Sequence, residues 1–104
     1  QLIKDGLMEA TDIKQLDSFK AGMLFARAEG IIPAPESCHA IAAAINEAEL
    51  CKETGQEKVI LFNLSGHGLI DMTAYDQYLS GSLYNYELTD EDVQKNLDSI
   101  EKYV

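Results

Sequence analysis

Ser65, Gly66, His67 and Gly68 form the segment whose residue types best suit chemistry. They follow an apolar run, residues 58–64 (KVILFNL), which predicts a buried β-strand. In open α/β folds, ligands bind at the carboxyl ends of strands, where a hydroxyl and free backbone N–H groups can meet them. Glycines there allow close backbone approach and unusual dihedral angles. An ordinary turn explains the segment equally well, because the lysine of a phosphate loop and the first glycine of a nucleophile elbow are absent.

His67 and two further side chains could take part in chemistry, and each has a structural alternative. His67 lies in the turn and His39 in the first turn of an expected helix, where a lone histidine is more often structural or exposed. Glu36 follows Pro35 at the start of that helix, where the helix dipole favours a carboxylate. A helix-start role therefore stands beside a ligand-binding role for Glu36.

The cysteines and the overall charge exclude several classes of function. Cys38 and Cys51 are expected on one helix, about 20 Å apart, which is too far for a disulfide. They have no metal-binding pattern with the histidines, so we expect two free thiols, no metal and a cytoplasmic, reducing location. The formal net charge of -10 argues against binding to nucleic acid or to an anionic membrane. Since the chain begins with Gln1 rather than Met, we expect it to start inside a longer protein.

The elements that must position these residues are mostly helices. Apolar periodicity predicts helices from Asp12 or Asp17 to residue 28, and over residues 36–54, 73–81 and 90–102. Gly30 and Gly55 are expected to end the first two helices. Capping pairs, Thr73 with Asp76 and Thr89 with Asp92, are expected to open the last two. Residues 58–64 form the clearest strand, and a short second strand is possible at residues 7–11.

One clear strand cannot form a sheet. The predicted fold class is therefore α/β, with this chain either borrowing strands from a partner or forming the mostly helical part of a larger domain. We divide the chain into residues 1–81, part of that domain, and residues 82–104, an acidic helical tail.

Two stretches resemble the C-terminal region of tryptophan synthase beta chains. They are residues 29–44 (EGIIPAPESCHAIAAA) and residues 58–81 (KVILFNLSGHGLIDMTAYDQYLSG). The resemblance covers roughly residues 7–81. His67, where commoner beta chains have arginine, and the following Leu-Ile-Asp run make the chain similar to the second, divergent class. Pairing with the usual alpha subunit is therefore left open.

The resemblance implies a fragment of a three-layer, fold-type II enzyme that uses pyridoxal 5'-phosphate (PLP). Such enzymes condense L-serine, or a related donor, with indole to give L-tryptophan. Ser65 matches the serine whose hydroxyl faces the pyridine nitrogen, and a neutral hydroxyl can donate to that nitrogen. Gly66 and Gly68 match the glycines beside the ring, and Glu36 matches a glutamate that lines the cofactor cavity. His67 is assigned proximity only.

The resemblance also implies what this chain lacks. Family members bind PLP through a lysine and a phosphate loop in the N-terminal half, and the catalytic glutamate lies there too. Neither motif occurs here, so we predict no catalytic residue in this chain, no PLP binding by the chain alone and no activity. The parent is expected to be a homodimer. Two alternatives remain: a piece of a threonine or cysteine synthase relative, or a free-standing helical module for protein association.

Overall fold

The two longest helices follow the apolar spacing of the sequence. The computed structural model describes residues 1–86 and 88–101. In it α1 covers Gln15–Glu29 and α2 covers Pro35–Thr54. Both helices end at a glycine in the left-handed conformation, Gly30 at φ 71° and Gly55 at φ 68°, as predicted. The first helix has no side-chain cap, and Asp17 lies within its first turn, so neither predicted cap residue opens it.

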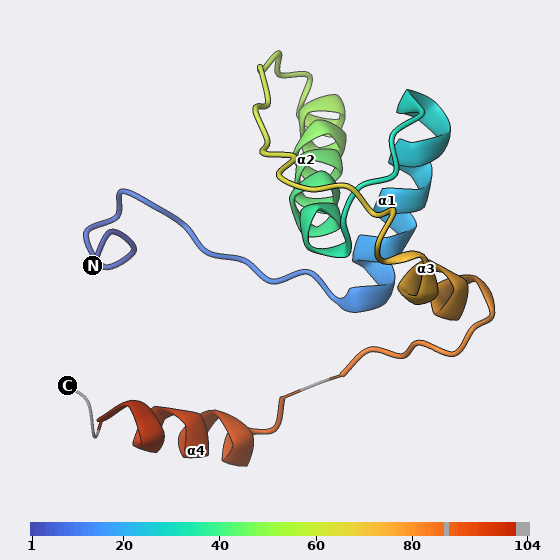
Figure 1. Ribbon diagram of the computed structural model, residues 1–104. Coiled ribbons are helices and arrows are strands. Elements are labelled where there is room, and N and C mark those ends of the chain that lie inside the picture. The colour runs from blue at the N-terminus through green and yellow to red at the C-terminus, as the bar shows by residue number, and fades with distance from the viewer. Residues whose placement is uncertain (87, 102–104) are drawn as a thin grey trace.

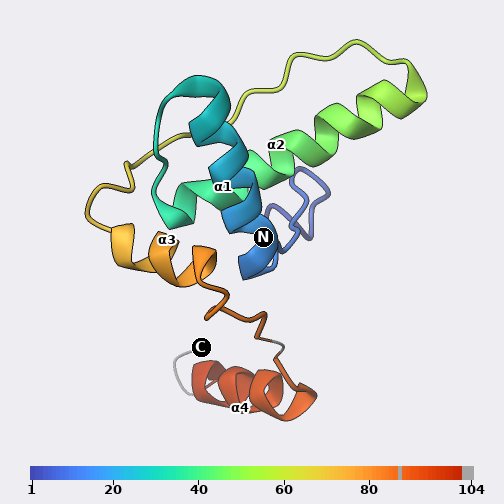
Figure 2. The ribbon, with the colours of Figure 1, turned by 90° about the vertical axis from the view of Figure 1, so that its right-hand side faces the viewer.

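The core lies where α1 and α2 pack together (Figures 1 and 2). One cluster joins Ala21 of α1 to Ile41 and Ala42 of α2. A second cluster joins Phe19 and Cys38 to Tyr75 of α3, which covers Met72–Leu79. Small residues at the contact let the helices approach closely, and the aromatic rings fill the space at the α3 end.

The predicted strands are not formed in the part of the chain that the structure describes. Residues 58–64 run beside α2 without a helix, turn or bend, as Figure 1 shows in yellow-green, and residues 7–11 are also irregular. The described residues hold a single isolated β-bridge, an antiparallel contact of Pro33 with His67. A strand requires a hydrogen-bonded neighbour, and residues 1–86 and 88–101 supply none for residues 58–64. The described part is therefore helical, and the α/β class is not visible in it.

The residues before α3 depart from the predicted cap. α3 begins at Met72, so Thr73 lies inside it, and the residue before the helix, Asp71, makes no side-chain cap hydrogen bond. The last helix, α4, covers Asp90–Glu101. Its predicted capping pair is confirmed, because Thr89 Oγ1 accepts from the Asp92 N–H at 3.2 Å while Asp92 Oδ2 accepts from the Thr89 N–H at 3.2 Å.

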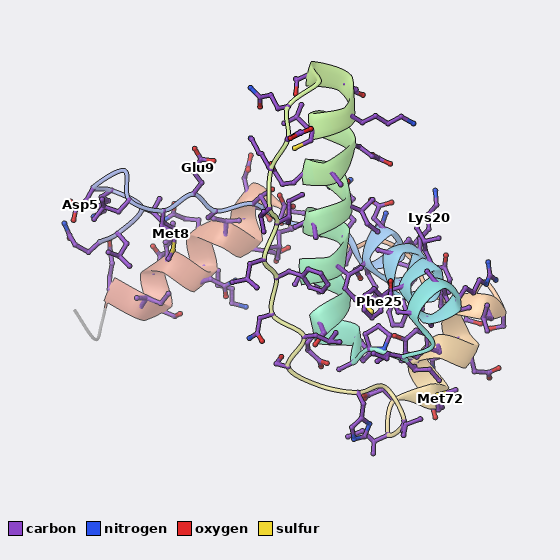
Figure 3. The ribbon with its side chains drawn as sticks, turned by 90° about the horizontal axis from the view of Figure 1, so that it is seen from above. Asp5, Met8, Glu9, Lys20, Phe25 and Met72 are labelled. Carbon is purple, nitrogen blue, oxygen red and sulfur yellow. The ribbon has the colours of Figure 1, made fainter. Side chains whose placement is uncertain are left out.

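The two ends of the chain lie outside the core. The N-terminal arm, residues 1–14, extends away from the helices, and Figure 3 shows Asp5, Met8 and Glu9 along it. Figure 1 shows α4 standing apart from α1–α3, and none of its described residues is buried. Among the helices in the described ranges, none combines the length and apolar character that a membrane span needs.

Candidate functional site

The turn formed by Ser65–Gly68 is held against the loop that leads into α2. The Ala34 N–H donates to the Gly66 carbonyl oxygen at 2.9 Å, and the Gly68 N–H donates to the Ile32 carbonyl oxygen at 2.8 Å. These two bonds flank the bridge between Pro33 and His67. The structure therefore brings together two motifs that lie about thirty positions apart in the sequence, the Pro-Ala-Pro-Glu loop and the Ser-Gly-His-Gly turn.

Both glycines of the turn allow its backbone to lie close to neighbouring residues. A Cβ added at Gly68 would lie 2.6 Å from the Pro33 carbonyl oxygen and 2.9 Å from the Tyr75 ring. A Cβ added at Gly66 would lie 3.1 Å from the Ala34 Cβ. Neither glycine has a positive φ, so the expected unusual dihedral angles are not observed. The absence of a side chain lets the turn lie directly on the 32–34 loop.

Ser65 presents an exposed hydroxyl at the start of this turn. Within the described residues the Ser65 hydroxyl makes no hydrogen bond, so it is free to donate to a group outside the chain. Glu36 is also exposed, in the first turn of α2 and two positions after Ala34. The 34–66 backbone bond therefore joins the segments that carry the two side chains.

The side chain of His67 makes a hydrogen bond within the turn. Its Nδ1 accepts a hydrogen bond from the Leu69 N–H at 3.2 Å, while the side chain stays exposed. His39 is exposed on α2. Neither histidine contacts a charged partner in the described residues: His67 hydrogen-bonds within the turn, and His39 is exposed to solvent.

The pair formed by Cys38 and Tyr75 lies behind the turn and was not singled out from the sequence. The Cys38 Sγ lies 3.3 Å from the Tyr75 hydroxyl, and that hydroxyl donates to the Pro33 carbonyl oxygen. Burial is the main cause that raises the pKa of the Cys38 thiol, and the Glu36 charge adds to it. Burial also raises the pKa of Tyr75, with the Cys38 contact second. Both groups are therefore held neutral, and Cys38 is a poor nucleophile.

Little else in the described ranges could hold a charged cofactor. A groove of about 900 Å³ runs between the residues 12–14 and helices α1 to α3, and neither the turn nor Glu36 lines it. The described lysines are all exposed: Lys4, Lys14, Lys20, Lys52, Lys58 and Lys95. No cluster of three or more metal-binding side chains occurs within residues 1–86 and 88–101.

The donor set of the turn fits one part of PLP. A single neutral hydroxyl, on a backbone held by two hydrogen bonds, suits a ring nitrogen as acceptor. A phosphate is usually held by converging N–H groups together with cations, and the turn carries no lysine or arginine. The turn therefore suits the pyridine end of the cofactor better than its phosphate end.

Comparison with known proteins points to one family. The chain is 64% identical over 78 residues to tryptophan synthase beta chain 2 of Aquifex aeolicus, a match that covers 75% of this chain and 18% of that protein. It is 59% identical over 83 residues to the beta chain 2 of Methanosarcina acetivorans, covering 80% of this chain and 19% of that protein. It is 60% identical over 75 residues to the beta chain 2 of Thermotoga maritima, covering 72% and 18%. No protein-family model matches the chain.

The chain thus spans less than a fifth of the length of these relatives, and the match lies in their C-terminal portion. The name "beta chain 2" agrees with the resemblance to the second class that His67 and the following residues indicate. Over about 75–83% of its length, this chain belongs to the tryptophan synthase beta chain family and corresponds to a C-terminal portion of its members.

Proposed function

We propose that this chain supplies the pyridine side of a PLP site in an enzyme that joins L-serine to indole, giving L-tryptophan and water. The observation that carries the proposal is the exposed Ser65 hydroxyl, which has no partner in the described residues and sits on a turn held by two backbone hydrogen bonds. The relatives at 59–64% identity are named tryptophan synthase beta chains. The cofactor, when bound, withdraws electrons from the amino-acid substrate.

The contribution of Ser65 is to orient the ring and tune its electronics. A neutral hydroxyl donates to the ring nitrogen without protonating it, which leaves the ring a weaker electron sink than an aspartate partner would. This suits exchange of the substituent at the β-carbon of serine better than full charge delocalisation into the ring. Gly66 and Gly68 let the backbone of the turn lie directly against the 32–34 loop, and this close contact holds the turn that carries Ser65. In the parent enzyme, Glu36 lines the cofactor cavity from the start of α2.

The remaining parts of the site belong to the rest of the enzyme. The lysine that binds PLP, the phosphate loop and the catalytic glutamate are supplied by the part of the relatives that this chain does not match. The isolated chain therefore neither binds PLP specifically nor turns over substrate. The parent is a cytoplasmic homodimer, and its pairing with an alpha subunit is left open by the divergent His67 turn.

A hybrid protein tests the proposal. The C-terminal portion of the Aquifex aeolicus beta chain 2 is replaced by this chain, and L-tryptophan formation from L-serine and indole is measured. We expect the hybrid to form tryptophan and to show the absorbance of bound PLP. A folded hybrid that binds PLP but forms no L-tryptophan from L-serine and indole contradicts the assignment. Added to the isolated chain, PLP should give no absorbance band beyond that of its exposed lysines.

A further inference from the structure

Tyr75 contacts both segments of the candidate site, the 32–34 loop and the Ser65–Gly68 turn, from their buried side. It lies on α3, is 3% exposed, and packs edge-on against Phe19 with ring centroids 5.2 Å apart. Its hydroxyl crosses 42 positions of sequence to donate to the Pro33 carbonyl oxygen. Pro33 lies between Ile32 and Ala34, the two residues whose backbone hydrogen bonds fix the turn. By binding Pro33, Tyr75 therefore fixes the loop against which the Ser65 turn is held.

The same side chain also contacts the turn directly. The Cε2 atom of Tyr75 would lie 2.9 Å from a Cβ added at Gly68, so the ring rests on the Gly68 backbone. The turn is therefore enclosed on two sides, by the 32–34 loop through hydrogen bonds and by the Tyr75 ring through contact. The Ser65 hydroxyl makes no hydrogen bond of its own in the described residues, so the backbone of the turn is what sets its position.

Gly22 of α1 makes room for the pair formed by Cys38 and Tyr75. A Cβ added at Gly22 of α1 would lie 2.3 Å from the Cys38 Sγ and 3.3 Å from the Tyr75 hydroxyl oxygen. A glycine within a helix is unfavourable by about 1 kcal/mol relative to alanine, so its presence here is explained by the polar pair it accommodates. A phenylalanine at position 75 would fill the same space without a hydrogen-bond partner, so the hydroxyl is explained by its contacts with Pro33 and Cys38.

We propose that Tyr75 is the positioning residue of the Ser65 turn: its hydroxyl fixes Pro33, its ring supports Gly68, and together they aim the Ser65 hydroxyl at the cofactor ring. This rests on the proposed function for its last step, the presence of the ring. The holding of the turn itself depends only on contacts within this chain. Tyr75 touches neither substrate nor cofactor and acts through the backbone.

The first test follows the turn in the isolated 104-residue chain. In Tyr75→Phe, we expect the amide resonances of Ser65, Gly66 and Gly68 to shift and the Ala34 and Gly68 amides to exchange with solvent about tenfold faster or more. Tyr78→Phe is the matched control, because Tyr78 also stacks on Phe19, at 5.5 Å, while its hydroxyl makes no hydrogen bond in the described residues. Cys38→Ala keeps the hydrogen bond to Pro33 and should leave the turn in place. If Tyr75→Phe moves these resonances no more than Tyr78→Phe does, the proposal is overturned.

The second test uses the hybrid protein and separates positioning from general stability. In Tyr75→Phe, assayed well below its unfolding temperature, we expect a shifted PLP absorbance maximum and a kcat about tenfold lower, with the KM for indole changed less. Equal absorbance and kcat, with only a lower unfolding temperature, would mean a structural role and would overturn the proposal. If the unsubstituted hybrid shows no PLP band, the proposed function fails instead, and the resonance test on the isolated chain still decides whether Tyr75 holds the turn.

Discussion

Gly68 is the residue of the turn with the least room for a side chain. An alanine there would bring its Cβ within 2.6 Å of the Pro33 carbonyl oxygen, a backbone atom that cannot move without breaking the contacts of the loop. We expect Gly68→Ala to lower the free energy of unfolding by about 1–3 kcal/mol. Gly66→Ala should cost less, since its Cβ would meet only the Ala34 Cβ, at 3.1 Å. Urea unfolding followed by circular dichroism measures both, and equal losses would contradict this account of the turn.

The buried pair of Cys38 and Tyr75 should make the folded protein less stable as the pH becomes alkaline. Burial raises the pKa of Cys38 and of Tyr75, so the folded state favours both neutral forms. Their contribution is complete below the unfolded pKa values, about 8.5 for cysteine and 10 for tyrosine, and is lost as the pH rises past them. We therefore expect the unfolding temperature to fall from about pH 8.5 upward. Cys38→Ala should move the onset toward pH 10, whereas Cys51→Ala, the control, should leave it in place. An unfolding temperature that stays level from pH 7 to 11 would contradict the assignment.

For single residues, the sequence indicates which ones could take part in chemistry, but it does not indicate which groups they contact in the fold. Ser65, Gly66 and Gly68 could be singled out because a hydroxyl and two glycines follow an apolar run, and Glu36 because it opens a helix. Tyr75 could not be predicted as a contact of the site, since nothing local indicates that its hydroxyl reaches Pro33, 42 positions away. The only local indication is Gly22 inside α1, where a side chain would collide with Cys38 and approach the Tyr75 hydroxyl.

Among the elements, α4 depends most on local interactions. None of its described residues is buried, and the reciprocal bonds of Thr89 and Asp92 cap its start. The hydrogen bonds from Thr89 lower the pKa of Asp92, so the cap is present above the ordinary carboxyl pKa of about 3.9 and is lost as the pH falls through the lowered value. Asp92→Ala, which removes the acceptor, should reduce the helix content of α4, seen in Cα chemical shifts at pH 7. Asp90→Ala removes the same charge from the first turn without removing a cap bond, and a loss of equal size there would contradict the capping role.

Residues 58–64 show why a strand could be predicted but not formed. Val59 is 100% exposed and Leu61 95%, while Phe62 reaches Phe25 of α1, labelled in Figure 3, at 6.1 Å between ring centroids. Alternate residues thus face the helices and solvent, as in a strand with one face covered. Helices satisfy their backbone internally and form here from local spacing, whereas a strand needs neighbours that local sequence cannot supply.

This predicts fast amide exchange in residues 58–64 of the isolated chain. No backbone group in this segment is hydrogen-bonded within the described residues, whereas the amides in the middle of α2 are bonded and partly buried. We expect the 58–64 amides to exchange at close to the rates of an unstructured peptide, and the α2 amides at least about 100-fold more slowly. In the hybrid protein the same amides should become protected. Protection already present in the isolated chain would show that the segment finds a partner without the rest of the enzyme.

Several features of the whole molecule indicate that it is part of a larger parent protein. It matches less than a fifth of the length of its relatives, its N-terminal arm and α4 stand apart from α1–α3, and its predicted strand has an apolar face in solvent. The division at residue 81 remains a prediction. On α4 the apolar stripe of Val93, Leu97 and Ile100 is exposed, and such a stripe can be covered either by its own domain or by another subunit.

The central claim, that the Ser65 turn is the pyridine side of a PLP site, is tested most directly by Ser65→Asp in the hybrid protein. A carboxylate at this position would favour a protonated ring nitrogen and a stronger electron sink. We predict a shifted absorbance of the bound cofactor and a turnover of L-serine and indole about tenfold lower or more, while Ser65→Thr, which keeps the hydroxyl, stays close to the original protein. Unaltered cofactor absorbance and turnover in Ser65→Asp would contradict the claim.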